Sequence, residues 1–419
     1  MSDNLSSVQL RKWTIMIYLA GDNNLESYGL KDLSEMSRIG STTDVAIVAQ
    51  LDRMADRITR RYFIASNMTV EANCVAELAE VNTGDPTALL EFITWVTQTY
   101  PAQKYALVLW NHGSGWKDED IYNIAQRQEV AEKVTRGQIR GLTSGKSSRA
   151  LFRSSLESLI IDLVQTERAI LFDDSSADFL DNLELRLVLQ KAVEQLGHPL
   201  DLIGFDACLM NMIEVSYQIR DLCHVMVGSQ ELEPGDGWPY DALLAGLIKD
   251  PEMTPEGLGH AIVEDYVNFY QTHFPHLSIT QSAIRLNRID KLVEVLDKLA
   301  HLLKDSLPNR ETLGLIFSAL RSTQRFSDRD YVDLAHFCQV LTSYDADGAI
   351  GKAARLVTNL LGSKASPVIA EGHHGPNVTN SHGMSIYLPA RNLSPLYHRL
   401  EFAQHHAWDE FLTAFTLPT

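Results

Sequence analysis

Trp13-Thr-Ile-Met-Ile-Tyr-Leu-Ala20, followed directly by Gly21-Asp-Asn-Asn24, is the stretch that decides the fold. Most of its first eight residues are β-branched, aromatic or otherwise apolar, which predicts a strand buried on both faces. Glycine, aspartate and asparagine are turn formers, so the strand is expected to end at a polar loop after Ala20.

The same apolar pattern recurs along the chain and predicts further strands. They are expected at Val45–Leu51, Arg61–Ile64, Tyr105–Trp110, Leu200–Phe205 and Val225–Ser229. Residues 87–99 carry apolar side chains at helical spacing after Asp85-Pro86, which predicts a helix between two strands. Strands separated by helices indicate an α/β fold with a mainly parallel sheet, and the short run from Arg61 is expected to have an antiparallel neighbour.

The last third of the sequence has a different pattern, which is mostly helical. Helices are expected at Ile289–Leu303, Arg310–Arg321, Tyr331–Leu341 and Ala349–Leu361, followed by a β run at Met384–Leu388 and a final helix around 396–415. We therefore predict a main domain over residues 8–285 and a C-terminal subdomain over residues 286–419 that packs on it.

Composition narrows the class of protein. Hydrophobic residues make up 45% and charged residues 21% of the 419, as in a packed globular protein. The net charge of −18 disfavours nucleic acid as a partner, and no apolar run reaches the roughly 20 residues that a membrane helix needs. The first residues show neither a basic nor an apolar leader, so a cytoplasmic location is expected, with secretion as the alternative.

Residues 117–168 depart from this pattern and form a predicted insert. Between Ala131 and Ser155 six basic residues face a single acid, Glu132. The centre of the insert, Arg140-Gly-Leu-Thr-Ser-Gly-Lys-Ser-Ser-Arg149, has the composition of a linker.

Polar side chains that could take part in catalysis follow three of the predicted strands. They lie in Ala20-Gly-Asp-Asn23, Trp110-Asn-His-Gly113 and Phe205-Asp-Ala-Cys208. Ligands of open α/β sheets bind at the carboxyl ends of strands, so these residues are expected to meet in one crevice. A cysteine nucleophile needs a proton shuttle and oxyanion donors, which His112 and the N–H groups of Gly113 and Cys208 would provide.

Several stretches, in this order, resemble the clostripain family of cysteine peptidases, within the caspase–gingipain–legumain clan. They are Trp13–Leu25, Leu109-Trp-Asn-His-Gly-Ser-Gly-Trp116, Gly204-Phe-Asp-Ala-Cys-Leu-Met210, Gly228-Ser-Gln-Glu-Leu-Glu-Pro-Gly-Asp-Gly-Trp238, Tyr331–Phe337 and Gly383–Pro389. The resemblance implies a caspase-like three-layer sandwich with a C-terminal extension. It also implies cleavage of peptides or proteins after Arg or Lys, with His112 and Cys208 as the catalytic residues.

The resemblance further implies that Asp206 lines the pocket for P1, the substrate residue before the cleaved bond. A buried carboxylate selects a guanidinium through a charge-assisted pair. Asp236 is a candidate second acid, although a solvated turn explains it equally well, and Ser229 is a candidate for the pocket wall. Asp22 and Asn23 could border the crevice, or simply form its turn.

Some members of this family are activated by a cut between the histidine and the cysteine. A protease that prefers basic residues would find Arg140, Lys146, Arg149 and Arg153 in its own insert, and exposed loops are preferred sites of nicking. Lys146 or Arg149 is the expected position, without a clear separation from Arg153. The alternative is an uncut surface loop.

No cofactor is expected for the chemistry, but calcium stays open as a structural or activating ion because some family members respond to it. The acidic run Asp173-Asp174, Asp178 and Asp181 could bind calcium, although a helix N-terminal cluster explains it more simply. His373, His374 and His382 lack acidic or cysteine partners at ligand spacing and are expected to be loop residues.

Other motifs match poorly. Gly141–Ser147 resembles a phosphate loop, but position 140 is Arg where the motif needs Gly. Ser114 lacks the Gly-x-Ser-x-Gly pattern because residue 112 is His. The remaining cysteines, Cys74, Cys223 and Cys338, are expected to be core or surface thiols.

Two other functional classes remain open. A catalytically inactive caspase-like scaffold would show no turnover that depends on Cys208. A metallohydrolase that uses the C-terminal histidines would be sensitive to chelators and would survive Cys208→Ala. The sequence gives no indication of the oligomeric state.

Overall fold

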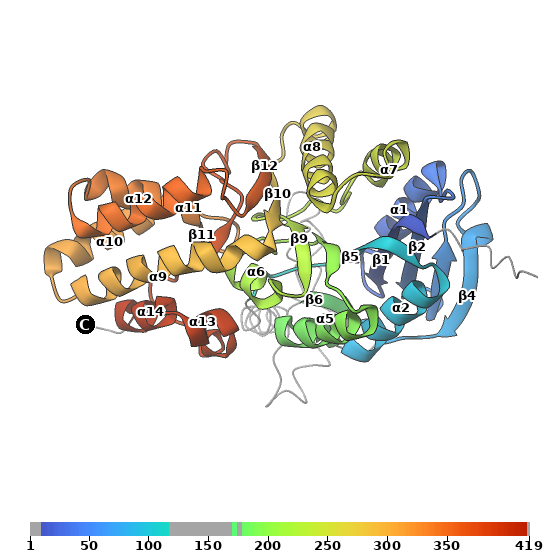
Figure 1. The fold of residues 1–419 in the computed structure, drawn as a ribbon, viewed down its shortest axis with the longest axis horizontal. Coiled ribbons are helices and arrows are strands. Elements are labelled where there is room, and N and C mark those ends of the chain that lie inside the picture. The colour runs from blue at the N-terminus through green and yellow to red at the C-terminus, as the bar shows by residue number, and fades with distance from the viewer. Residues whose placement is uncertain (1–9, 117–169, 174–177, 417–419) are drawn as a thin grey trace, which may run out of the picture.

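The computed structural model describes residues 10–116, 170–173 and 178–416 of the 419-residue chain. Within these residues a single large sheet forms the centre, with helices on both faces and a group of helices at one end (Figure 1). None of the described helices combines the length and apolar character needed to cross a bilayer.

The central sheet has the strand order β12-β10-β9-β8-β5-β1-β2-β3-β4. Its strands are β1 (Arg11–Gly21), β2 (Val45–Arg53), β3 (Ile58–Phe63), β4 (Cys74–Ala79), β5 (Ala102–Trp110), β8 (Leu200–Asp206), β9 (Cys223–Gly228), β10 (Ile279–Arg285) and β12 (Val368–His374). The five strands from β9 to β2 are mutually parallel, and the strands outside them pair antiparallel. The predicted mainly parallel sheet is therefore confirmed, including the antiparallel neighbour of the strand that contains Arg61.

Helices cover this sheet on two sides, which makes three layers. They are α1 (Glu26–Ile39), α7 (Tyr240–Lys249) and α8 (Pro255–His273) on one face, and α2 (Pro86–Thr99), α5 (Asn182–Leu196) and α6 (Ile213–Ile219) on the other (Figure 1). The side chains of β1 alternate between the two layers. Ile15, Ile17 and Leu19 pack with α1, and Met16 and Tyr18 pack with α2.

Local signals set the ends of these helices. The Asp85 side chain accepts a hydrogen bond from Thr87 N at 2.7 Å, and Pro86 occupies the first helical position of α2. Asp181 caps α5, with a capping box that it forms with Glu184. The helix-cap interpretation of the acidic run is therefore confirmed for Asp181.

The C-terminal helices form a group at one end of the molecule (Figure 1). They are α9 (Ile289–Ser306), α10 (Arg310–Ser322), α11 (Leu334–Tyr344), α12 (Ala349–Leu361), α13 (Glu401–His405) and α14 (Trp408–Thr416). Their apolar faces merge with the α2–α5–α6 side of the sheet into one core.

Two sequence predictions were wrong in this part. The helix expected from Tyr331 begins at Leu334, because residues 331–333 form strand β11, which pairs with β13 (Ser385–Tyr387), and Asp333 caps α11 by accepting from His336 N at 2.8 Å. The helix expected around 396–415 is broken at His406, which is extended. Ala407 N there donates to Asp297 Oδ1 at 2.7 Å.

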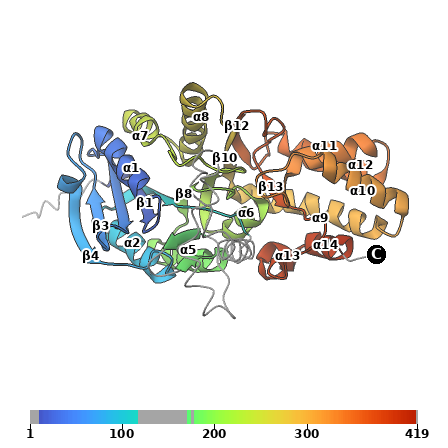
Figure 2. The ribbon, with the colours of Figure 1, turned by 180° about the vertical axis from the view of Figure 1, so that it is seen from behind.

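Strand β12 lies beyond residue 285 in the sequence and still belongs to the central sheet. It pairs antiparallel with β10, with Ile279 opposite His374 (Figure 2). The C-terminal part therefore supplies an outer strand of the main sheet, and the division at residue 285 stays a prediction.

Candidate active site

The candidate site lies where β5 and β8 end side by side. Trp110 is the register partner of Asp206, and Asn111 N donates to Asp206 O at 3.3 Å. His112 and Cys208 each come two residues after this matched pair. The parallel register therefore brings the two predicted catalytic residues to one edge of the sheet.

Gly113 is required by the closeness of these two chain segments. A Cβ atom at this position would lie 3.1 Å from Cys208 N and 3.1 Å from Ala207 Cβ, and it would collide with Cys208 O. Only a residue without a side chain permits this approach. The backbone of the His-Gly turn thus packs directly against the backbone of the cysteine.

The sulfur of Cys208 is held against the loop that follows β9. Glu233 N donates to Sγ at 3.2 Å. Burial raises the pKa of the Cys208 thiol to about 12, and the backbone N–H groups of Glu233 and Gly113 oppose this shift without cancelling it. The thiol is therefore protonated at neutral pH.

His112 is 9% exposed, and its ring is placed by the loop after β1. Its Nε2 lies 3.2 Å from Asn24 Oδ1 and donates to that oxygen in the tautomer with the proton on Nε2. Asn111 accepts from His112 N with its side-chain oxygen and donates to Ala20 O at 2.9 Å. Burial lowers the pKa of His112 to about 4, so the imidazole is neutral at neutral pH.

Asp206 lies beneath the loop of residues 237–240 and is only 5% exposed. Its Oδ2 accepts from Trp238 N at 3.2 Å and from the Tyr240 hydroxyl at 2.9 Å. Gly237, with a φ of +61°, leaves both carboxylate oxygens uncovered, because a Cβ there would lie 3.1 Å from each. Burial raises the pKa of Asp206 to about 6, and its hydrogen bonds oppose this shift.

The acid beside Asp206 is Glu233. Burial and the charge of Asp206 raise the pKa of Glu233 well above its ordinary range, and a hydrogen bond from Glu233 in turn lowers the pKa of Asp206. Gln281 Nε2 donates to Glu233 Oε1 at 3.2 Å. Two adjacent buried carboxyl groups cannot both ionise cheaply, so Glu233 keeps its proton and Asp206 ionises first. We call Asp206 and Glu233 the pocket acids.

Asp236, the expected second acid, instead forms an ion pair with Lys31, with Nζ 2.5 Å from Oδ1. A different buried acid, Asp32, lies near Asp206 and keeps its proton at neutral pH. Asp32 on α1 is 1% exposed, and burial followed by the charge of Asp206 raises its pKa to about 9.

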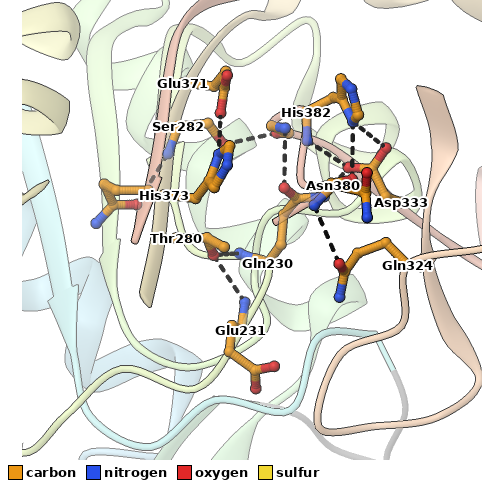
Figure 3. Close-up of polar contacts among 12 residues, drawn as sticks. Gln230, Glu231, Thr280, Ser282, Gln324, Asp333, Glu371, His373, Asn380 and His382 are labelled. Carbon is orange, nitrogen blue, oxygen red and sulfur yellow. Dashed lines mark hydrogen bonds and ion pairs between the residues drawn. The ribbon is translucent and has the colours of Figure 1, made fainter. Parts of the chain in front are cut away.

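Ser229, a predicted wall residue, lies inside the loop rather than on its surface. It is fully buried, its Oγ lies 2.8 Å from Thr280 Oγ1, and it donates to Glu231 O at 2.9 Å. Thr280 Oγ1 also accepts from the backbone N–H groups of Gln230 and Glu231, at 2.9 and 3.1 Å (Figure 3). These bonds fix the start of the loop that reaches Cys208.

The same loop is anchored in the C-terminal part through Asp333. Gln230 Nε2 donates to Asp333 Oδ2 at 3.0 Å, and Gly383 N donates to Gln230 Oε1 at 2.9 Å. His382 N also donates to Asp333 Oδ2, at 2.7 Å (Figure 3). The wall of the site and the C-terminal β11–β13 region are therefore one hydrogen-bonded unit.

The three C-terminal histidines have separate partners. His382 Nδ1 lies 3.1 Å from Asp333 Oδ1, His373 Nδ1 lies 3.2 Å from Glu371 Oε2, and His374 Nε2 lies 2.9 Å from Pro275 O (Figure 3 shows the first two). Within residues 10–116, 170–173 and 178–416, the group able to hold a metal ion lies elsewhere. The metallohydrolase alternative loses its basis.

The acidic run is divided by the fold. Asp178 accepts from Asn82 Nδ2 at 2.7 Å, and Asp173 accepts from Thr83 N at 2.9 Å. Asp174 lies outside the described residues. So do the four candidate cleavage residues, Arg140, Lys146, Arg149 and Arg153.

Two residues of this site were not singled out from the sequence, Asn24 and Glu233. Both belong to stretches that carry chemistry, Gly21–Asn24 and Gly228–Trp238. Asn24 follows a strand end like the other crevice residues. A glutamate followed by proline and glycine gives no signal that separates a buried acid from a turn.

A thiol and an imidazole at neighbouring carboxyl ends of a parallel sheet, in a three-layer α/β fold, define a cysteine peptidase of the caspase-like type. Comparison with known proteins agrees. The sequence pattern of the clostripain family matches residues 17–131 and 158–415. The chain belongs to the clostripain family and is a cysteine peptidase, which favours the enzyme over the scaffold alternative.

Individual relatives are distant in sequence. Clostripain of Hathewaya histolytica is 24% identical over 444 aligned residues, which cover 90% of this chain and 75% of the relative. A secreted C11 cysteine protease from Bacteroides thetaiotaomicron, solved with an irreversible peptide inhibitor, shares 17% identity at a TM-score of 0.61, over 96% of this chain and 99% of that chain. An inactive zymogen C11 protease from Parabacteroides distasonis shares 19% identity at a TM-score of 0.62, over 94% and 98% of the two chains. The solved structures confirm the predicted caspase-like fold.

Proposed function

We propose that this peptidase is an endopeptidase that cleaves after Arg or Lys, with Cys208 and His112 as its catalytic pair and Asp206 as the P1 selector. The observation that carries this proposal is the position of the pocket acids. Glu233 N touches the sulfur of Cys208 at 3.2 Å, and the side chain of Glu233 lies beside Asp206. A buried negative charge directly behind the nucleophile favours a cationic side chain next to the cleaved bond.

The catalytic steps follow from the neutral resting state of the pair. His112 takes the thiol proton of Cys208 as the sulfur attacks the substrate carbonyl, and the N–H groups of Gly113 and Cys208 stabilise the resulting oxyanion. The imidazolium then gives its proton to the leaving amine as the C–N bond breaks. Water, deprotonated by His112, hydrolyses the thioester and restores the thiol.

The guanidinium of P1 Arg would displace no strong partner of Asp206. Trp238 N and the Tyr240 hydroxyl both donate to Oδ2, and the third donor, the protonated Glu233, is neutral, so the negative charge of Asp206 keeps its capacity for a cationic N–H group. The proton on Glu233 would leave Asp206 as the single ionised acid of the pair.

Asp206→Asn tests the assignment of the P1 selector. Loss of one partner of a desolvated charge pair is expected to cost about 2–5 kcal/mol for Arg substrates, which is about 30-fold to several thousand-fold in kcat/KM. The measurement compares matched peptides with P1 Arg and P1 citrulline, the neutral analogue. Asp236→Asn is the control, because Asp236 pairs with Lys31. Equal losses for both peptides would show that Asp206 has only a structural role.

We further propose that the enzyme cuts its own insert, at Lys146 or Arg149 with Arg140 and Arg153 as alternatives. The support is the basic composition of the insert in an enzyme that selects basic P1 residues. Intact mass and N-terminal sequencing of purified protein should show two fragments for wild type and full length for Cys208→Ala. A fully active wild type that stays one chain would overturn processing as the activation step.

Secretion is the location that we propose. The support is that two similar solved structures are described as a secreted C11 cysteine protease from Bacteroides thetaiotaomicron. No similar structure supports the cytoplasmic location expected from the first residues. Fractionation of the native host with detection of the protein in the extracellular fraction tests this.

A further inference from the structure

Strand β11 of the C-terminal part contacts both chain segments that carry the proposed catalytic pair. Tyr331 and Asp333 are two residues apart in this strand, so their side chains leave it on the same side. Tyr331 reaches the turn that follows His112, and Asp333 reaches the loop that touches Cys208. We call β11 and its antiparallel partner β13 the C-terminal ribbon.

Tyr331 holds the turn on the side of His112. Its hydroxyl donates to Ser114 O at 2.7 Å, and its side chain is buried. Its ring also packs against Gly115, which has a φ of +73°, and a Cβ atom at Gly115 would lie 2.8 Å from Tyr331 Cε2. The turn reaches the ring only because residue 115 has no side chain. Ser114 is two residues after His112, so the ring and its hydroxyl fix the turn that carries the imidazole.

Asp333 holds the loop on the side of Cys208. This buried carboxylate accepts from Gln230 Nε2 at 3.0 Å (Figure 3). The oxygen of the same Gln230 amide accepts from Gly383 N at 2.9 Å. Gln230 is three residues before Glu233, whose N–H donates to Cys208 Sγ at 3.2 Å. Both polar groups of one buried amide are therefore bound to the C-terminal part, which ties the loop beside the sulfur to the ribbon.

The second strand of the ribbon reaches the chain just after the nucleophile. Ser385 donates to Asn211 O through its backbone N–H and through its hydroxyl, each at 3.0 Å. Asn211 is three residues after Cys208, and its side-chain amide donates to Gly228 O at 3.2 Å. Ser385 is the register partner of Asp333. One paired position of the ribbon therefore contacts the segment after Cys208 and the loop beside its sulfur.

We propose that the C-terminal ribbon sets the position of His112 relative to Cys208, with Tyr331 and Asp333 as positioning residues on the two sides. Proton transfer between the thiol and the imidazole needs the two groups at hydrogen-bond distance, and a misplacement of about 1 Å can cost a hundredfold in rate. A short strand that binds both segments fixes this distance. The inference rests on the proposed catalytic pair, but it does not depend on the P1 preference or on self-processing.

Tyr331→Phe tests the side of His112, because it removes the hydroxyl and keeps the ring. With a peptide that the wild type cleaves, kcat should fall about fivefold to tenfold and KM should stay within about twofold. The kcat is expressed per active site, titrated with an irreversible peptide inhibitor, so that unfolded protein, the result of a merely structural role, does not count. Tyr344→Phe, an exposed tyrosine on α11, is the matched control and should keep the wild-type kcat.

Gln230→Met tests the side of Cys208, because methionine keeps the length of the side chain and loses both hydrogen bonds of the amide. Its kcat per active site should fall by a similar factor. If the ribbon fixes the pair, breaking either link already frees one side relative to the other. The double variant Tyr331→Phe/Gln230→Met should therefore lose less than the product of the two single losses.

Three results would overturn the proposal: a wild-type kcat in Tyr331→Phe, a loss confined to KM, or single losses that multiply fully in the double variant. If Gln230→Met fails to fold, Ser385→Ala takes its place, because it removes the hydroxyl that reaches Asn211. Near wild-type turnover by His112→Ala or Cys208→Ala would refute the catalytic pair and the ribbon with it. Inactivity of both, together with an unaffected Tyr331→Phe, would refute the ribbon alone.

Discussion

The pocket acids and a second group, Asp22, Asp52 and Asp173, are two sets of buried carboxyl groups at the carboxyl edge of one sheet, and they differ in their donors. We call this second group the carboxylate cluster. Asp206 receives Trp238 N and the Tyr240 hydroxyl, and Glu233 receives Gln281. In the carboxylate cluster, Thr59 donates to Asp52 and Thr83 donates to Asp173.

This difference teaches how one sheet edge can hold buried acids in two ways. In the pocket, one proton shared between two carboxyl groups leaves a single negative charge, which suits one cationic side chain. In the carboxylate cluster, three acids converge from three segments, and burial, with the charges of Asp173 and Asp22, raises the pKa of Asp52 to about 7.

Substitution of the nucleophile beside the pocket acids is expected to have the largest effect on turnover. Cys208→Ala should abolish turnover, and His112→Ala should lower kcat/KM by several orders of magnitude, because covalent catalysis needs both groups. Cys74→Ala, a half-buried thiol outside the site, is the control and should keep full activity. Turnover by Cys208→Ala near the wild-type rate would sink the mechanism.

The proton on Glu233 gives the next largest effect. Glu233→Leu removes the hydrogen bond that lowers the pKa of Asp206, so this pKa should rise above its value of about 6. The kcat/KM for Arg peptides should then fall about tenfold near neutral pH, and its acid limb should move to higher pH. Glu233→Gln keeps a donor and should resemble wild type. An unchanged pH profile in Glu233→Leu would contradict the shared proton.

Asn24 connects the two sets, because it touches His112 and follows Asp22 by two residues. Asn24→Ala should reduce kcat about tenfold with little change in KM, since the imidazole loses the acceptor that orients it. Asn24→Asp restores an acceptor and should recover activity, with the pH profile moved upward because a carboxylate raises the pKa of the imidazole. Steady-state kinetics between pH 5 and 9 check both. A loss confined to KM would exclude orientation of His112.

The smallest expected effect concerns stability and pH. Burial raises the pKa of Asp32 to about 9 and that of Glu214 to about 7, so the folded state keeps protons that the unfolded chain releases above about pH 4. The free energy of unfolding should therefore fall as pH rises from about 5 to 9. The unfolding temperature of Cys208→Ala at pH 5.5 and 8.5 measures this fall, and Asp32→Asn should reduce it. A higher unfolding temperature at pH 8.5 would contradict this.

Much of the fold could be predicted because the apolar runs are unambiguous. The run at Trp13 and the one at Tyr105 are near-continuous, so a buried parallel sheet follows from composition alone. The carboxyl-edge rule then brings His112 and Cys208 together without any knowledge of the distances. Tyr331–Asp333 escaped prediction because a three-residue strand depends on a partner more than fifty residues later.

The rest of the site could not be predicted because its contacts are long-range. Asp22, Asp52 and Asp173 are separated by 30 and 121 residues, and no local spacing marks them as neighbours. The pairing of Asp236 with Lys31 depends on how α1 packs beside the loop after β9. Glu233 differs from an ordinary turn acid only by burial, which a single sequence does not reveal.

The matched register of β5 and β8 has a consequence for how the molecule can be divided. These neighbouring strands in the middle of the sheet lie on opposite sides of residues 117–169, and Trp110 faces Asp206 across their shared ladder. A single break between them would turn this ladder into the contact between two polypeptides, one with His112 and the other with Cys208. Such a molecule would be an obligate heterodimer whose halves each contribute one reactive group. Because its interface would be the core of the former single domain, the two halves would stay together on dilution, and dilution would not inactivate the enzyme.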